Sequence, residues 1–394
     1  MLGLGSSLTK SARSVPTIVS DGLVLQHNYA RGSVEPCSTG AADINADAVG
    51  SENIDVGTIA IADGDVSISA WVYVTAFVDE AAIFSNRHAS VPNQGIELRC
   101  DSDGFEVLID EATSSSTNAV TSAKNTNQWY HVCGVWDRSG TQYIYVDGVL
   151  DGTPDDITSQ ADSLAHATTA RIGRDGGGSS YFRGHICNVG YWNKVLTQAQ
   201  VKSIMHKDYA SLSASEKTGL VSWWNLDSVI DSVGAPTAVY DNHYELGSEL
   251  VTNGDFGSNS SWTLVETGES TVDISGGTLN INVGGDDGYV YATQSITYES
   301  GSIYVMEATF TRTSGGGGKL RFQDNLGDLG GLTDSQTETE LTGGEQSVKF
   351  YFKANSNSTL LAIVRDGSAS GLPVTVKVKS ISLKKVNGNH GTLS

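Results

Sequence analysis

The sequence predicts an all-β protein with two antiparallel β-sandwich domains and one or two short helices. The chain of 394 residues contains 45 Gly and many Ser and Thr, and few of its segments have helical periodicity. Several stretches alternate large or β-branched residues with small or polar ones, which is the pattern of half-buried strands. A chain of this length commonly forms two or three domains.

The clearest predicted element is a hairpin. Residues 129–136 and 141–146 both alternate in character, and the polar segment 137–140 between them ends in Gly, as a turn does. A second tight turn is predicted at Asp147-Gly148, because Gly accepts the positive φ that a two-residue loop requires.

Two tryptophans of this hairpin have different predicted environments. Trp129 and Trp136 lie an odd number of residues apart, so they face opposite sides of one strand. One of them can anchor a core. The other needs a second covering layer or a role at the surface.

The remaining elements follow in chain order. The arm over residues 1–20 is irregular, and residues 114–127 form a polar loop. Other segments of the first half have strand patterns: 22–29, 42–45, 53–56, 66–74, 83–84, 95–100, 105–109, 170–174 and 182–192.

Two helix starts are predicted from capping boxes. Thr197 is followed three residues later by Gln200, and this helix extends to about Asp208. Ser213 and Glu216 form a second box. Residues 220–226 then read as a strand that returns to the first sheet.

The sequence of the hairpin, QWYHV…D…G…YIYVDG, resembles the corresponding motif of the laminin-G-like, concanavalin A-like jelly-roll family. Residues 66–74, 170–174 and 182–192 are similar to other strands of that family, in the same order. The resemblance covers roughly half of the chain. It implies a fold rather than a function, because this fold occurs in lectins, adhesion modules, glycosidases and virion spikes.

A second resemblance begins near residue 245. Residues 249–256, ELVTNGDF, with Trp262 after them, are similar to the opening of a carbohydrate-binding-module-like jelly roll. The dipeptide Asn-His occurs before this module, at residues 242–243, and again at residues 389–390. In related jelly-roll proteins an ending like residues 388–393 follows a strand like residues 220–226. This resemblance implies that residues 245–386 are an insertion, with chance similarity of the short matches as the alternative. The predicted organisation is an irregular arm, the laminin-G-like jelly roll, the second sandwich and a tail, over residues 1–20, 21–244, 245–386 and 387–394.

Composition excludes several function classes. The net charge of −21 disfavours binding to nucleic acid and to anionic membranes. No apolar run reaches the ~18–20 residues of a membrane span, and no signal peptide is expected. The four cysteines lack metal-ligand spacing and are interpreted as small buried hydrophobic residues: Cys37, Cys100, Cys133 and Cys187.

Catalysis is not predicted. A glycoside hydrolase needs two carboxylates about 5–10 Å apart, and related enzymes place them on one strand. The nearest acidic strings here begin at Glu97 and Glu106, and neither alternates in that way. The sequence also has no serine nucleophile elbow, zinc-protease motif, phosphate loop or dinucleotide fingerprint. The protein is therefore expected not to be an enzyme.

Glycan binding and calcium binding are the predicted site chemistries. Exposed aromatic rings stack on sugars, and the candidates, each with a place in the core as its alternative, are Tyr181, Phe182, Tyr289 and Tyr291. Calcium takes oxygen ligands from acidic loops, and the candidates, each with ordinary turn chemistry as its alternative, are Asp43, Asp47, Asn53 and Asp255. At Asp255 the sequence departs from the binding-module pattern, because Lys379-Ser380 stands where that family has an acid. No other cofactor is expected.

The whole arrangement resembles a virion surface protein of a tailed bacteriophage, as a capsid decoration protein, a head fibre or a tail fibre. This resemblance implies a jelly-roll adhesion protein that is assembled in the host cytoplasm and exposed on the virion. The implied partners are a major capsid or tail protein, host-surface glycans and further copies of the chain. Residues 1–20 would attach it to the particle. The alternatives are a carbohydrate-active enzyme or accessory module, and a cement protein without a ligand.

Overall fold

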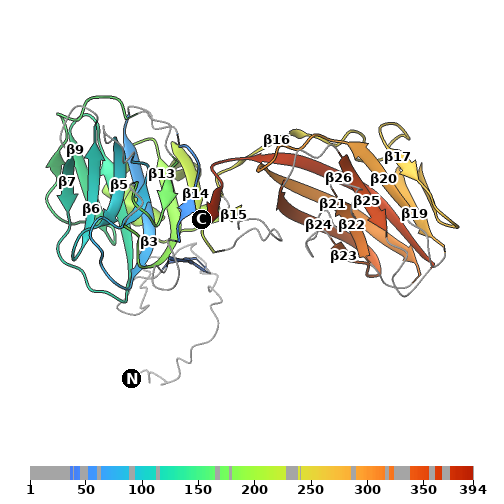
Figure 1. Ribbon diagram of the computed structural model, residues 1–394, viewed down its shortest axis with the longest axis horizontal. Coiled ribbons are helices and arrows are strands. Elements are labelled where there is room, and N and C mark those ends of the chain that lie inside the picture. Colours follow the sequence, from blue (N-terminus) through green and yellow to red (C-terminus); the bar gives the residue numbers. More distant parts are fainter. Residues whose placement is uncertain are drawn as a thin grey trace, which may run out of the picture.

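The protein is nearly all β, as predicted. Among the residues that the computed structural model describes, the strands form four sheets, all of whose named strand pairs are antiparallel, and only short helices occur. The two sandwiches lie side by side along the longest axis and are joined by a narrow junction (Figure 1). The described residues are 36–38, 40–44, 52–59, 64–87, 94–111, 116–164, 169–176, 180–227, 238–239, 241–284, 290–315, 319–323, 338–354, 360–365 and 373–393.

Sheet 1 of the first sandwich contains the predicted hairpin. Its strands have the order β1-β13-β3-β8-β9-β10, with β11 paired to β9 and β14 paired to β13. Asp147 and Gly148 both have positive φ, as the predicted two-residue turn requires. The bounds are β1 (Ala42–Ile44), β3 (Val66–Val74), β8 (Trp129–Trp136), β9 (Thr141–Val146), β10 (Val149–Leu150), β11 (Asp155–Asp156), β13 (Gly184–Trp192) and β14 (Leu220–Trp224).

Sheet 2 packs against sheet 1 and has the strand order β15-β27-β2-β12-β4-β5-β6-β7. The prediction of a polar loop over residues 114–127 was wrong in part, because residues 117–120 pair with β6 as an edge strand. The bounds are β2 (Ile54–Asp55), β4 (Ala82–Ser85), β5 (Gly95–Cys100), β6 (Phe105–Asp110), β7 (Thr117–Val120), β12 (Arg171–Ile172), β15 (Ala238–Val239) and β27 (Gly391–Leu393).

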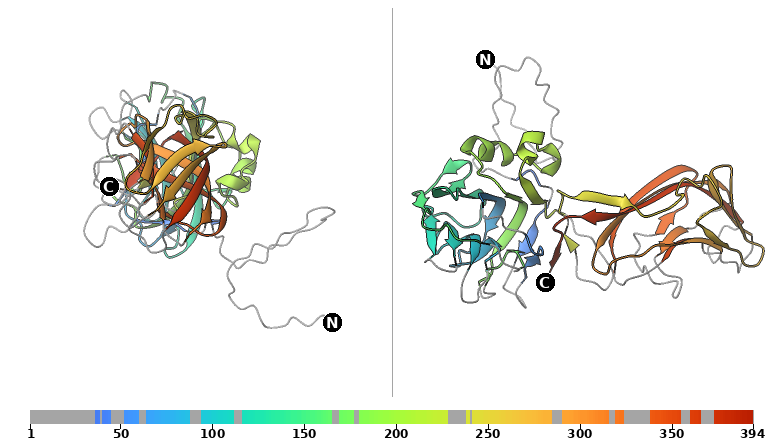
Figure 2. Two further views of the ribbon diagram at one scale, coloured as in Figure 1. Left: turned by 90° about the vertical axis from the view of Figure 1, so that its right-hand side faces the viewer. Right: turned by 90° about the horizontal axis from the view of Figure 1, so that it is seen from above.

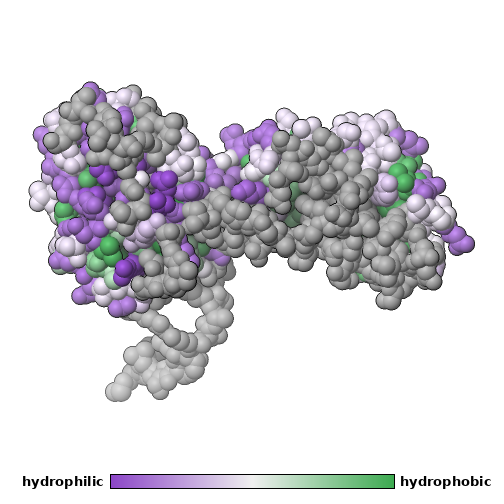
Figure 3. All heavy atoms as spheres, in the orientation of Figure 1, coloured by the Kyte–Doolittle hydropathy of each residue, from purple (hydrophilic) through white to green (hydrophobic). Residues whose placement is uncertain are grey.

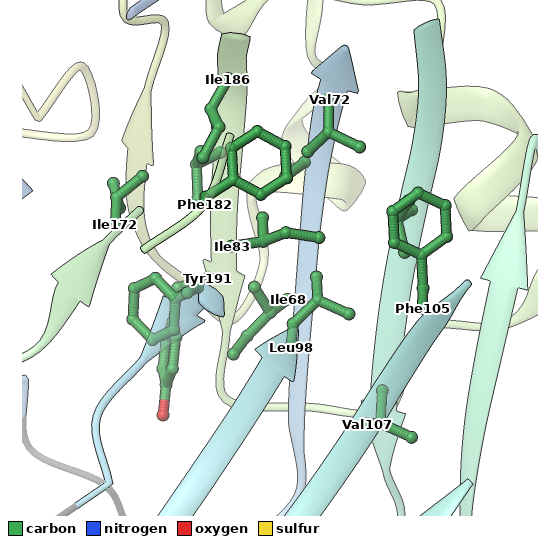
Figure 4. Close-up of a cluster of buried hydrophobic side chains, with 14 of the residues drawn as sticks. Ile68, Val72, Ile83, Leu98, Phe105, Val107, Ile172, Phe182, Ile186 and Tyr191 are labelled. Carbon is green, nitrogen blue, oxygen red and sulfur yellow. The ribbon is translucent and has the colours of Figure 1, made fainter. Parts of the chain in front are cut away.

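The main core lies between these two sheets. Alternate residues of each strand point inward, so β3 contributes Ile68 and Val72 while β5 contributes Leu98 (Figure 4). Trp136 is fully buried in this core. Trp129 is half-buried on the opposite face of the same strand, as the odd spacing predicted.

Short helices cover part of the outer face of sheet 1 (Figure 2). Both predicted capping boxes are present, at the start of α1 (Gln198–Ile204) and α2 (Ala214–Lys217), with the 3-10 helix η1 (Tyr209–Ser211) between them. Helix α1 ends four residues earlier than predicted. Its buried face packs on Cys133 and Val135 of β8. No described helix has the length and hydropathy of a membrane span.

The second sandwich consists of sheets 3 and 4. Sheet 3 has the order β18-β19-β26-β21-β24, with β16 on β26, and sheet 4 has the order β17-β20-β25-β22-β23. The bounds are β16 (Glu245–Glu249), β17 (Thr263–Val265), β18 (Thr271–Ser275), β19 (Thr278–Val283), β20 (Val290–Ser295), β21 (Ile303–Ser314), β22 (Lys319–Gln323), β23 (Glu338–Glu340), β24 (Gly344–Lys353), β25 (Leu360–Arg365) and β26 (Val374–Asn387).

The chain leaves and re-enters the first sandwich at one place. β15 precedes the second sandwich, β27 follows it, and β27 lies between β15 and β2 in sheet 2. The strand order thus places the second sandwich between β15 and β27, as an insertion does. The final strand of the described chain therefore completes a sheet whose other strands lie more than a hundred residues earlier.

A buried carboxylate joins the two crossing segments. Asp241 has no exposed surface, and its oxygens accept backbone N–H groups of Trp223, His243 and Asn389, each at 2.9 Å. The Asp241 N–H donates to Nδ1 of His390, so Nε2 carries the ring proton toward the Val386 carbonyl. Burial lowers the pKa of His390 to about 4, which keeps the ring neutral.

Candidate functional site

A row of four side chains crosses neighbouring strands on the outer face of sheet 1. Trp129 of β8 lies opposite Tyr73 of β3, Tyr73 lies opposite His185 of β13, and His185 lies opposite Asp43 of β1. Residues opposite one another in adjacent strands point to the same face, so the four side chains form a continuous strip. We call Trp129, Tyr73, His185 and Asp43 the aromatic row.

The three rings of the aromatic row are in mutual contact. The Tyr73 ring lies 5.6 Å from the Trp129 ring and 5.6 Å from the His185 ring, measured between centroids. Trp129 and His185 are 6.4 Å apart and only 35° from parallel, although their strands are separated by β3. The two outer rings therefore lean toward each other across Tyr73. Nδ1 of His185 is 3.4 Å from the Asp43 carboxylate.

A buried pair of rings lies beside the aromatic row on the same face of sheet 1. Two residues further along β3 and β8, Trp71 and His131 are also opposite each other, and their rings meet edge to face. The indole N–H of Trp71 donates to the Met205 carbonyl at the end of α1. Burial lowers the pKa of His131 to about 3, so its imidazole is neutral and packs against the Trp71 ring.

Helix packing explains why the aromatic row is open. The cluster around α1 covers the part of this face formed by Cys133, Val135 and Trp192. Beyond that cover Trp129 and Tyr73 remain half-buried, while the side chains of His185 and Asp43 are 39% and 63% exposed. On the face that Figure 3 shows, the coloured part of the surface is mostly hydrophilic, with small separate hydrophobic patches.

Of the four residues in the aromatic row, only Asp43 was predicted from the sequence as a site residue, and then as a calcium ligand. The sequence feature that pointed to this face was the odd spacing of Trp129 and Trp136. It indicated that one of the two tryptophans lies at the surface or under a second covering layer. What the sequence lacked was the register that places Tyr73 and His185 beside Trp129, because these residues lie on strands far apart in the chain.

The predicted aromatic residues that the structure describes do not form one accessible group. The Phe182 prediction was wrong, because this ring is fully buried in the main core and cannot stack on a sugar (Figure 4). Tyr181 is half-buried, with the Arg174 guanidinium 5.3 Å above its ring. Tyr291 is half-buried on β20 of the second sandwich. Tyr289 lies outside the described residues.

The predicted calcium ligands do not form a described cluster either. Asp43 belongs to the aromatic row, and Asp47 lies outside the described residues. Asn53 is fully buried, and its side-chain oxygen accepts a hydrogen bond from the Arg174 guanidinium at 3.4 Å. This cation stands where a calcium ion would need the oxygen as a ligand. Asp255 is exposed and accepts from the Gly257 N–H. Within the described ranges no three His, Cys, Asp or Glu side chains are placed to hold a metal, and calcium binding stays a prediction.

The acids at Glu97 and Glu106 are brought together across two strands rather than along one. Arg99 bridges them on the outer face of sheet 2, with Nη1 3.2 Å from Glu97 and Nε 2.8 Å from Glu106. Glu97 has no exposed surface, and its oxygens also accept from the Ser85 hydroxyl and the Gly176 N–H. Burial raises the pKa of Glu97, against the opposing effects of Ser85 and Arg99. Arg99, Glu97 and Glu106 therefore form a buried network of ion pairs, which we call the ion network.

Known proteins are similar to this chain only to a low degree. No curated protein sequence is significantly similar to the chain. Among solved structures, a Bacteroides ovatus protein provisionally described as carbohydrate-binding has 23% identity and a TM-score of 0.37, with 52% of this chain and 56% of that one covered. The enzymatically active domain of a bacteriophage CBA120 tailspike has 17% identity and a TM-score of 0.27, with 35% and 21% covered. The chain thus spans only part of either protein.

A third solved structure is covered by this chain over almost its whole length. The xylan-binding domain from Paenibacillus barcinonensis has 15% identity and a TM-score of 0.27, with 36% of this chain and 98% of that domain covered. The sequence comparison is more specific, because residues 48–202 match the family described as the concanavalin A-like lectin/glucanases superfamily (Laminin_G_3). This part of the chain, which holds most of the aromatic row, is therefore similar to a concanavalin A-like jelly-roll domain.

Proposed function

We propose that the protein is a non-enzymatic glycan-binding adhesion protein that holds saccharide on the aromatic row. The observation that carries the proposal is the register of Trp129, Tyr73 and His185, which assembles three accessible rings on one sheet face. Aromatic rings present a flat apolar surface and, in Tyr and Trp, a polar edge. A sugar has the matching arrangement, with C–H groups on one face and hydroxyl groups around its rim.

The polar end of the aromatic row supplies hydrogen bonds for such a ligand. The Asp43 carboxylate accepts hydroxyl protons, and the neighbouring His185 ring offers a second polar edge. Strands lie about 4.8 Å apart, but the Trp129 and His185 ring centroids are only 6.4 Å apart, so the three rings form one compact stacking surface. Residues 48–202 are similar to the concanavalin A-like lectin/glucanases superfamily, which is compatible with saccharide binding on the outer face of sheet 1.

Replacing Trp129 by Ala is expected to weaken glycan binding about tenfold or more, because it removes the largest ring of the row and large aromatic residues dominate many binding surfaces. The measurement is binding of the full chain to a panel of immobilised polysaccharides. Tyr145→Ala is the matched control, since Tyr145 is also half-buried on the outer face of sheet 1 but stacks on Tyr143 beside the helix cover. Equal binding by the Trp129→Ala variant and the parent would contradict the proposal.

The same panel separates the enzyme alternative. A carbohydrate-active enzyme would release soluble oligosaccharides, and Glu97→Gln or Glu106→Gln would abolish that release. The proposed adhesion protein binds polysaccharide without product formation, whichever acid is changed. A cement protein without a ligand would give flat binding across the whole panel.

We further propose that this adhesion protein belongs to a bacteriophage virion, on its head or tail, where it contacts a capsid or tail protein and further copies of itself. The support is the resemblance of the paired jelly rolls to virion surface proteins. Immunogold labelling and mass spectrometry of purified particles should find the protein on the particle, and deleting residues 1–20 should abolish its incorporation. Particles that lack the protein would overturn the virion location and leave the glycan proposal standing.

A further inference from the structure

A hollow of about 590 Å³ lies on the outer face of sheet 3 in the second sandwich. Its floor is formed by β21, β24 and β26, and its wall by residues 249–255. The volume is within the range of about 300–1,000 Å³ that is usual for small-molecule sites. None of the side chains of the aromatic row lines it.

Short hydroxyl side chains create the floor. Ser347, Thr309 and Ser380 lie opposite one another on β24, β21 and β26, and the hydroxyls of Thr309 and Ser347 are 3.1 Å apart. Immediately after this row the register of β21 and β26 shifts, so one strand carries an extra residue, Lys379. Such bulges bend a sheet and re-aim its side chains, and they recur beside binding sites.

The wall is held against the sheet by specific contacts. The Glu249 carboxylate accepts from the Leu383 N–H at 2.8 Å and from the Val251 N–H at 3.1 Å. At Gly254 the backbone approaches so closely that a Cβ atom would lie 2.1 Å from the Ile381 carbonyl oxygen. Only glycine permits this approach, so the wall is a built element of the hollow rather than a loose loop.

The charges of the hollow select against anionic ligands. Glu307 and Lys349 form an ion pair of 2.8 Å on the floor, and both side chains are about half exposed. Glu249 and Asp255 add two more carboxylates to the lining, which contains no other cation than Lys349. The lining also lacks aromatic side chains. A ligand here must therefore be uncharged or cationic and be held through hydrogen bonds rather than by stacking.

From these features we infer that the hollow is a second glycan site, which takes a neutral saccharide edge-on. Hydroxyls, carboxylates and one ammonium group together offer the mixed donors and acceptors that sugar hydroxyls require. The inference rests on the proposed glycan-binding function and extends it, because a chain with two separate sites binds a polysaccharide with avidity. The two sites also differ in kind, one stacking and the other hydrogen-bonding.

Thr309→Arg tests the inference by filling the hollow from its floor. Thr311→Arg is the matched control, since Thr311 lies on the same face of β21 but outside the lining. Four full-length proteins are titrated separately by calorimetry: the parent, Thr309→Arg, Thr311→Arg and Trp129→Ala. The ligands are neutral oligosaccharides of glucose, mannose, galactose and xylose. Thermal melting checks that each variant is folded. Oligogalacturonate serves as the anionic probe.

The expected result is that Thr309→Arg weakens binding of at least one neutral oligosaccharide about tenfold, while Thr311→Arg matches the parent and oligogalacturonate does not depend on Thr309. Binding that survives in Trp129→Ala and disappears in Thr309→Arg would support the hollow and count against the aromatic row. If no probe shows binding that depends on Thr309, the inference is overturned, whatever the result at Trp129.

Discussion

Replacing Arg99 by Met is expected to lower the free energy of unfolding by about 3–5 kcal/mol, because it leaves buried carboxylates without their cation. The side chains of Arg99, Glu97 and Glu106 are 8%, 0% and 4% exposed. Methionine retains much of the length and apolar volume of arginine but offers no donor. This loss is a large fraction of the roughly 5–15 kcal/mol that stabilises a typical domain.

The deficit should grow with pH. Burial already raises the pKa of Glu97 in the parent, and removing Arg99 raises it further. A carboxyl whose pKa is raised in the folded state stabilises the fold below its unfolded pKa, and this contribution is lost as pH rises through the folded value. The Arg99→Met variant is therefore closest to the parent at acidic pH and furthest from it at neutral pH. Urea unfolding at several pH values measures this difference.

An exposed ion pair provides the contrast for Arg99. Lys349→Met removes the partner of Glu307, but both of those side chains are about half exposed and the expected cost is under about 1 kcal/mol. Adding Glu97→Gln and Glu106→Gln to Arg99→Met should restore part of the stability, since no unpaired charge then remains buried. A loss as small for Arg99→Met as for Lys349→Met would show that the network is solvated.

Replacing Asp241 by Ala is the second large effect, with an expected loss of about 3–6 kcal/mol. The substitution leaves the N–H groups of Trp223, His243 and Asn389 without an acceptor, and each unsatisfied buried donor costs about 1–3 kcal/mol. The lost contacts lie where the final strand β27 enters sheet 2. The variant should therefore destabilise the first sandwich and loosen the junction.

Asp241→Asn is the control, because its single carboxamide oxygen keeps the bonds to Trp223 and His243 and loses the one to Asn389. Its expected loss is about 1–3 kcal/mol. Tryptophan fluorescence during urea unfolding reports on the first sandwich, and limited proteolysis reports on the junction. An Ala variant that unfolds with the parent and resists proteolysis equally would show that Asp241 does not hold the crossing segments.

The sequence alone determined the features that depend on neighbouring residues. The turn at Asp147-Gly148 follows from the backbone freedom of glycine, and the helix starts at Thr197 and Ser213 follow from local side-chain capping. The alternation in β8 also predicted that Trp129 and Trp136 face opposite sides. Each of these rests on contacts within a few residues, which a linear sequence displays directly.

Only the tertiary structure decided the features that depend on strand register. Alternation shows that neighbours such as Tyr181 and Phe182 differ in environment, but it does not say which ring enters the core. The pairing of Tyr73 with Trp129, of Arg99 with Glu106 and of Thr309 with Ser380 joins separate strands. Such pairing depends on how a whole sheet buries its inner face, so the aromatic row, the ion network and the hollow became visible only in the folded chain.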